Sequence, residues 1–221
     1  MMIPDVPSPI DLRLMSDASE WEAAAMQKRP WRAEFFAKFA DELMYMESPP
    51  GRVLELGSGP GFLAHKLLTE LSDLRMTLLD FSEAMHSLAR RRLGHMLNRV
   101  EFLVRSFKES DWFRDLNDFD AVVTNQAVHE LRHKRYAEEL HRQVARVLRP
   151  GGTYLVCDHF FGAGGMTNDQ LYLTAVEQQA AIDSAGYRSV RQVLLMGGLV
   201  MHRATTAHRA GISRPEAHAR A

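Results

Sequence analysis

Two hydrophobic repeats alternate along most of the chain, one typical of strands and one typical of helices. From Arg52 onward, short apolar runs are separated by stretches in which apolar residues recur every three or four positions. Five runs follow one another in this way: RVLELG, RMTLLD, VEFLVR, FDAVVTN and GTYLVCD. Strands that alternate with helices predict a parallel sheet covered by helices on both faces.

Two more apolar runs, SVRQVLL and LVMHRAT, flank Met196, Gly197 and Gly198 near the end of the chain. Two strands joined by a short connection that contains glycine predict a hairpin. A hairpin that follows parallel strands adds an antiparallel strand to the sheet. The pattern therefore predicts an α/β fold with a mostly parallel sheet.

The first 50 residues follow a different pattern. A proline-rich lead precedes a helical stretch from Ser16, in which SEWE has the spacing of a capping box. A second predicted helix has Pro30 in its first turn, where proline is well tolerated. One face of this helix is apolar, at Trp31, Phe35, Phe39, Leu43 and Met46. We expect an arm and lid helices over residues 1–50, one domain over 51–206 and a flexible tail over 207–221.

The composition fits one soluble α/β domain. The chain has 221 residues, of which 46% are hydrophobic, and a formal net charge of −1, so we expect no nucleic-acid partner. The one cysteine, Cys157, excludes an intrachain disulfide, indicates a reducing compartment and is expected to be a small buried hydrophobe. Without a signal-peptide pattern or a run of about 18 apolar residues, we expect a cytoplasmic protein with no membrane partner.

The stretch VLELGSGPG places Gly57, Gly59 and Gly61 directly after the first predicted strand. The dinucleotide fingerprint G-x-G-x-x-G does not fit, because Phe62 stands where its third glycine belongs, and no Gly-Lys-Ser/Thr follows as in a phosphate loop. Glu55 lies two residues before the loop, where a carboxylate would repel a pyrophosphate. The loop therefore favours a ligand with a positive end, although the glycines could also form only a tight turn.

Asp80 ends the second predicted strand, about twenty residues beyond the glycine loop. An acid at this place can accept hydrogen bonds from both hydroxyls of a ribose. S-adenosylmethionine has a ribose, no pyrophosphate and a cationic amino-acid portion. It therefore fits Glu55 and Asp80 together.

Five successive stretches resemble the motifs of class I S-adenosylmethionine-dependent methyltransferases. They are VLELGSGPG, LLDFSEAM, FDAVVTNQAVHEL, LRPGGTYLV and AGYRSVRQVLLMGGLVMHRA. The likeness runs from about Arg52 to Thr206, and its strength lies in the order and spacing of five individually weak motifs. The resemblance implies a three-layer Rossmann-like fold, with a seven-stranded sheet in which the C-terminal hairpin supplies one antiparallel strand.

The resemblance also implies the residues that bind the cofactor. Glu55 would hold the ammonium group, and Asp80 would bind the ribose hydroxyls. Asn125 would contact the methionine end through its backbone. The loop under the methionine portion would consist of Gly57, Ser58, Gly59 and Gly61.

The adenine site departs from the family pattern. The resemblance implies that Phe81 and Met85 enclose the adenine, although Met85 could equally be core packing. Many members carry an acid after the third strand that binds the adenine amino group, whereas this chain has Ser106 and Phe107. Adenine recognition must then depend on Ser106, the backbone or stacking.

His129 and His159 are the candidate catalytic residues. Both follow predicted strands, and ligands of such sheets bind beyond the carboxyl ends of the strands. Methyl transfer mainly requires orientation of the nucleophile and sometimes a base, for which histidine is suited at neutral pH. Alternatively, His129 caps a helix and His159 packs under its loop. No metal is expected, because TNQ and CDH do not reproduce the acids of the magnesium-using catechol-type enzymes.

HELRH also matches the H-E-x-x-H pattern of zinc peptidases, in which two histidines one helical turn apart bind the metal. A zinc-dependent hydrolase using His129, Glu130 and His133 is therefore an alternative. Two features count against it: His129 follows a strand, and Tyr136 and Glu139 stand where the extended pattern has glycine and histidine.

The sequence says less about the identity of the methyl acceptor. Asn125 is followed by Gln-Ala-Val and not by an N-P-P-Y-type motif, which disfavours nucleobase amines and glutamine. A lid with Trp21, Trp31, Phe35 and Phe36 would favour a compact organic acceptor, although ordinary helix packing explains the same aromatic residues about as well. We predict a methyltransferase of a small organic metabolite that releases S-adenosylhomocysteine. A non-catalytic S-adenosylmethionine-binding protein is a further alternative, and the oligomeric state, with a homodimer as one option, stays open.

Overall fold

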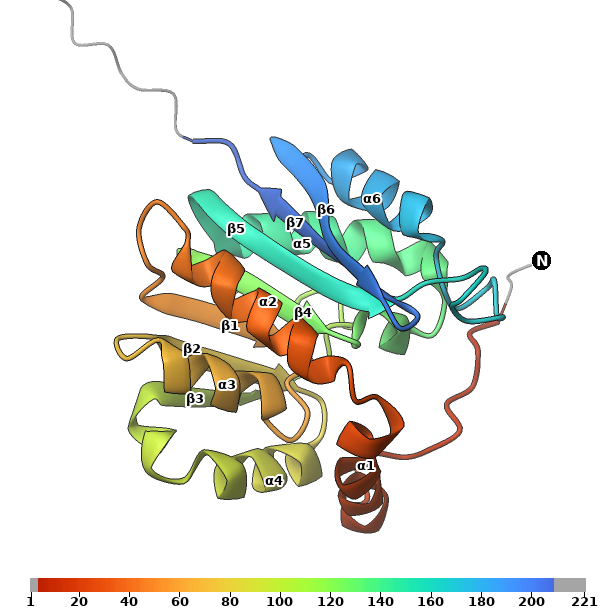
Figure 1. Cartoon of the computed structure of the whole chain (residues 1–221), viewed down its shortest axis with the longest axis horizontal. Helices are drawn as coiled ribbons and strands as arrows, with labels where there is room; N and C mark the ends of the chain where they lie inside the picture. Colours follow the sequence, from red (N-terminus) through yellow and green to blue (C-terminus); the bar gives the residue numbers. More distant parts are fainter. Residues whose placement is uncertain (1–3, 209–221) are drawn as a thin grey trace, which may run out of the picture.

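A seven-stranded sheet forms the middle of the molecule in the computed structural model, which describes residues 4–208 (Figure 1). Its strand order is β3-β2-β1-β4-β5-β7-β6. The strands are β1 (Arg52–Leu56), β2 (Arg75–Asp80), β3 (Val100–Val104), β4 (Phe119–Asn125), β5 (Leu148–His159), β6 (Ser189–Met196) and β7 (Leu199–Thr205). Only β7 runs antiparallel to its neighbours, β5 and β6. The predicted fold class is confirmed.

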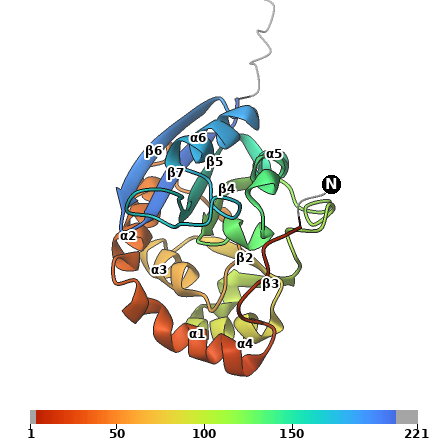
Figure 2. The same ribbon diagram turned by 90° about the vertical axis from the view of Figure 1, so that its right-hand side faces the viewer.

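Helices cover both faces of this sheet, as Figures 1 and 2 show. They are α1 (Met15–Lys28), α2 (Arg32–Met44), α3 (Phe62–Glu70), α4 (Glu83–Leu93), α5 (Ala137–Val147) and α6 (Ala175–Ser184), with the short 3-10 helices η1 (Gly94–Arg99), η2 (Val128–Leu131) and η3 (Lys134–Tyr136). Side chains of α2 and α3 share one core with the sheet, and those of α5 and α6 share another. Among residues 4–208, no helix combines the length and the apolar character needed to cross a membrane.

Alternation along the strands assigns side chains to the two cores. Val53 packs in the core below α2 and α3, whereas its neighbour Leu54 packs in the core with α5. Glu55 is on the same face as Val53, at the carboxyl end of β1, and therefore faces the site. Cys157 is fully buried in β5, as the small hydrophobe that the sequence predicts. In the hairpin, Gly197 and Gly198 both have positive φ, as a tight two-residue turn requires.

The first helix begins within one residue of the predicted Ser16, but its predicted capping box and the predicted place of Pro30 differ from the structure. The helix α1 begins at Met15 and has no side-chain cap, so Ser19 of the predicted capping box lies inside it. Tertiary packing decides this start, because Ala18 is fully buried against Met85 and Leu88 of α4. Pro30 precedes the N-cap of α2, which is Trp31, and so lies just outside the first turn.

The N-terminal residues divide between lid and core. Phe35 is fully buried in the core below α2, so α2 belongs to the helical layer of the domain. The stretch 4–14, which we call the strap, reaches the end of η2, where the N–H of Val6 donates to the carbonyl of Arg132 and the Nε of Arg132 donates to the carbonyl of Val6. The predicted flexible tail falls outside the described residues from residue 209 onward.

Candidate active site

A cavity of about 290 Å³ lies beyond the carboxyl ends of β1, β2, β4 and β5. The glycine loop and Asp80 form one side of the cavity, and the loop after β4 with His159 forms the other. Residues of α1 and α2 cover it, among them Trp21 and Phe36. Loops at this edge of an open α/β sheet are where such folds bind ligands.

The three loop glycines meet different requirements. A Cβ on Gly57 would lie 2.4 Å from the Cβ of Ala127, so glycine allows the loop to pack against the segment after β4. Gly59 has a φ of +52° and no neighbour within 4 Å of where its Cβ would be, which leaves room for a ligand. Gly61 is the left-handed N-cap of α3 and packs on Ala89 of α4, away from the cavity.

Glu55 and Asp80 are two buried carboxyls at the cavity. Glu55 is 2% exposed, and its Oε2 has no hydrogen-bond partner. Burial raises the pKa of Glu55 well above its usual range, and the charge of Asp80 adds to this. Asp80 accepts hydrogen bonds from the N–H of Gly59 at 2.8 Å and of Ser82 at 2.9 Å. Burial raises the pKa of Asp80 to about 6 despite these bonds.

Most of the remaining predicted cofactor residues border the same cavity. These are Ser58, Phe81, Met85, Phe107 and Asn125. The side-chain oxygens of Ser58 and Asn125 are buried without a partner. Ser106 is not among the described residues that border the cavity; its hydroxyl accepts the N–H of Lys108 within its own turn.

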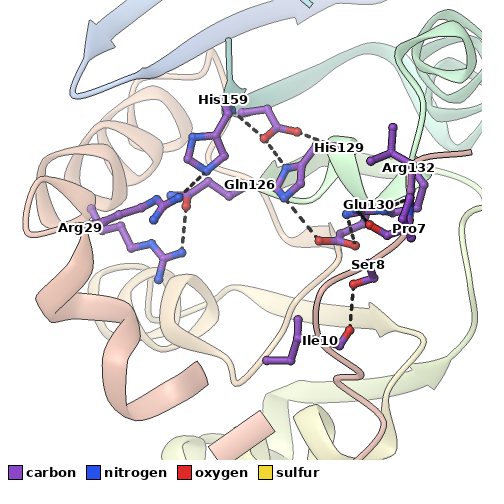
Figure 3. Close-up of polar contacts among 12 residues, drawn as sticks. Pro7, Ser8, Ile10, Arg29, Gln126, His129, Glu130, Arg132 and His159 are labelled. Atoms are coloured by element: carbon purple, nitrogen blue, oxygen red, sulfur yellow. Dashed lines mark hydrogen bonds and ion pairs between the residues drawn. The ribbon is translucent and has the colours of Figure 1, made fainter. Parts of the chain in front are cut away.

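Both ring nitrogens of His129 face a carboxylate (Figure 3). Nδ1 lies 2.7 Å from Asp158 Oδ1, and Nε2 lies 3.4 Å from Glu130 Oε1. Burial alone would lower the pKa of His129, but Asp158 and Glu130 outweigh burial and raise it to about 10. The ring is therefore an imidazolium at neutral pH, and it must lose a proton before it can act as a base.

His159 has the opposite character. Burial lowers its pKa to about 4, so its ring is neutral. Nε2 lies 3.2 Å from the Nη2 of Arg29, and it accepts this hydrogen bond because a guanidinium can only donate (Figure 3). The contact leaves His159 without a free lone pair and fixes the position of Arg29.

Comparisons with known proteins agree with this fold. The sequence matches the family described as a methyltransferase domain over residues 53–152. The malonyl-[acyl-carrier protein] O-methyltransferase of Geobacter sulfurreducens is 27% identical over 191 residues, which are 78% of this chain and 67% of that protein. The family match, the relative and the fold support a class I S-adenosylmethionine-dependent methyltransferase.

Solved methyltransferases have the same architecture. The Haloferax volcanii methyltransferase in complex with the activator Trm112 superposes with a TM-score of 0.69 at 20% identity, over 91% of this chain and 100% of that chain. Human N-acetylserotonin methyltransferase in complex with S-adenosylmethionine gives 0.67 at 15% identity, over 89% of this chain and 57% of that chain. The matched part of this chain thus spans little more than half of the human enzyme.

The H-E-x-x-H pattern does not form a zinc-peptidase helix in this methyltransferase. His129 lies in η2, whereas His133 precedes η3 and accepts the N–H of Arg135 with its Nδ1. Between them Arg132 is left-handed and ends the first turn. Across residues 4–208, no three histidine, cysteine or acidic side chains gather as metal ligands.

Two arginines of the methyltransferase site escaped the sequence analysis. Arg29 follows α1 and Arg32 begins α2, and both border the cavity. Arg32 is only 5% exposed; its Nη2 donates to Gln126 Oε1 at 2.8 Å, while its Nε has no partner. The stretch RPWR is the signal that was available, since it places two cations next to the lid aromatics.

Proposed function

We propose that this chain transfers a methyl group from S-adenosylmethionine to a small organic acceptor held in the same cavity. The observation that carries the proposal is the unpartnered, buried carboxyl of Glu55, which borders one cavity together with Asp80. A buried carboxylate is costly unless a cation or hydrogen-bond donors meet it. The ammonium group of the cofactor supplies that cation.

The residues around the cavity fit the rest of this cofactor. Asp80 retains lone pairs for two ribose hydroxyls, because an ionised carboxylate can accept about four hydrogen bonds. Phe81, Met85 and Phe107 offer apolar surface for the adenine. The bound cofactor supplies a methyl group on a positively charged sulfur, which is already an activated leaving group.

The transfer is an in-line displacement. A lone pair of the acceptor forms a bond to the methyl carbon, the carbon–sulfur bond breaks, and its electron pair neutralises the sulfonium. Any proton on the acceptor passes to water or to a neighbouring group. The protein contributes mainly by orienting the acceptor, which can lower the barrier by several kcal/mol. His129 and His159 border the cavity opposite the glycine loop, where they can orient it.

The residues that cover the cavity limit the size of the acceptor. Trp21 of α1, Phe36 of α2 and Leu12 of the strap all border the cavity, which favours a compact molecule. The Geobacter sulfurreducens relative is named for a malonyl group on an acyl-carrier protein. A short acyl group on a carrier is therefore included among the candidate acceptors.

The test is a transfer screen with S-adenosylmethionine that carries a tritiated methyl group. The purified protein is incubated with fractionated metabolite extracts and with malonyl-carrier protein, and labelled products are identified by mass spectrometry. We expect label in a small organic product together with S-adenosylhomocysteine. Binding of S-adenosylhomocysteine with no labelled product in any fraction would favour a non-catalytic binding protein.

A further inference from the structure

Arg29 and Arg32 form a cationic pair that no carboxylate of the described chain neutralises. Their recorded side-chain partners are neutral: His159 for Arg29, and Gln126 and the ring of Trp21 for Arg32. The Nε of Arg32 is buried without a partner. Burial lowers the pKa of Arg32 to about 10, and the charge of Arg29 contributes to this. A buried guanidinium in this condition is costly unless an anion meets it.

The partners of the pair lie at the ends of β4 and β5, next to Asn125 and the expected methionine end of the cofactor. Gln126 follows β4 and His159 ends β5, whereas Glu55 and Asp80 belong to β1 and β2. The strand order β2-β1-β4-β5 separates the two groups along the sheet edge. Figure 3 shows the guanidinium of Arg29 beside the ring of His159.

We propose that Arg29 and Arg32 bind a carboxylate of the methyl acceptor, so that the substrates are small organic acids. This inference rests on the proposed function and names its substrate class. His159 and Gln126 hold the two guanidiniums in place, which reduces the ordering that binding requires. Trp21 and Phe36 supply an apolar wall for the body of the acid.

The charges in this half of the site favour an anion. Asp158 and Glu130 pair with His129, and Glu130 also pairs with Arg132, so neither carboxylate neutralises Arg29 or Arg32. Lys28 also borders the cavity and adds to the positive charge. Arginine forks also match the planar carboxylate with paired hydrogen bonds.

The experiment compares acids with their uncharged amides. The unfolding temperature of the protein in complex with S-adenosylhomocysteine is measured with millimolar benzoate, phenylacetate, malonate or succinate. The same measurement is made with the corresponding amides. We expect at least one acid to raise the unfolding temperature by several degrees, and its amide to have no effect. Arg29→Gln and Arg32→Gln should abolish this shift, and Arg32→Lys should retain part of it. The matched control is Arg91→Gln, on the exposed side of α4, which should keep it.

A second measurement separates this inference from the proposed function. Both arginine variants should bind S-adenosylhomocysteine within about twofold of the wild type, because the arginines contact the acceptor and not the cofactor. A tenfold loss in Arg32→Gln would overturn the inference and assign the arginine to the methionine carboxylate. Equal shifts with acids and amides, or no shift with any acid, would also overturn it. A wild type that does not bind S-adenosylhomocysteine refutes the proposed function itself.

Discussion

Asp80 makes cofactor binding depend on pH. Its pKa of about 6 in the ligand-free protein means that a falling pH protonates the carboxyl and removes acceptors for the ribose hydroxyls. We expect the affinity for S-adenosylhomocysteine to fall by up to about tenfold per unit as the pH decreases below about 6. Calorimetry from pH 5 to pH 8 measures this.

The variant Asp80→Asn provides the control. It should bind about 10- to 100-fold more weakly at pH 7, the loss expected for hydrogen bonds to a charged acceptor, and it should show no such pH dependence. A folded variant with unchanged affinity would show that Asp80 does not bind the ribose. Because folding raises this pKa above 3.8, the stability of the ligand-free protein should decrease as the pH rises from about 4 to about 6.

His129 stabilises the fold through its charge. Its pKa is about 10 against an ordinary value of 6.5, so its contribution is complete below pH 6.5 and is lost as the pH rises toward 10. We expect His129→Gln to lower the free energy of unfolding by about 3 kcal/mol at pH 7, because it leaves Asp158 buried without its cation. Urea unfolding at pH 7 and pH 10 measures the change. A loss of the same size at both values would contradict the assigned charge.

Local spacing in the sequence predicted several residues that border the cavity, whereas features that depend on distant partners were missed. Glu55 and Asp80 could be interpreted because each stands at a strand end within a short motif. The charged state of His129 could not be predicted, since it depends on Asp158 in the neighbouring strand. Arg32 was missed because an arginine at the start of a helix is ordinarily on the surface.

The strap covers the part of the cavity that Phe81 borders, where we propose that the adenine binds. The guanidinium of Arg132 donates to the carbonyls of Val6 and Pro7 at 2.9 and 2.6 Å. Leu12 borders the cavity, and Arg13 lies 4.7 Å above the ring of Phe81. A strap held in this way should slow the release of the cofactor.

The variant Arg132→Ala tests this role of the strap. Loss of two hydrogen bonds should increase the dissociation rate of S-adenosylhomocysteine by about 5- to 10-fold and leave the association rate almost unchanged. Stopped-flow measurement of dissociation gives the rate. Arg142→Ala, an exposed arginine of α5, is the control and should behave as the wild type. An unchanged rate in Arg132→Ala would mean that the strap does not cover the bound cofactor.

The boundaries of helices and strands were predicted where local sequence sets them and missed where tertiary packing sets them. The strands β2, β4 and β7 begin and end where the apolar runs predict. The strand β5 begins earlier, at Leu148, because its first residues pair with Phe119 across an irregular register. The predicted start of α1 at Ser16 lies within one residue of the observed one, but the predicted capping box at Ser19 was wrong because its spacing is a local signal, whereas the burial of Ala18 against α4 is a tertiary one.

At the scale of the whole molecule, the alternation of strands and helices predicted the sheet and its hairpin, and the family resemblance predicted the three layers. The pattern could not show that α2 belongs to the core while α1 and the strap cover the cavity. That division depends on which apolar helix face packs against the sheet. In α2 this is the face that carries Phe35. The same arrangement brings Arg29 and Arg32 over the ends of β4 and β5.

The most direct test of the account is a calorimetric titration of the wild-type protein with S-adenosylhomocysteine and, separately, with NAD. The unpartnered carboxyl of Glu55, the pair of hydrogen bonds at Asp80 and the open space above Gly59 predict one S-adenosylhomocysteine site per chain and no heat with NAD. Binding of NAD, with no response to S-adenosylhomocysteine, would contradict the account.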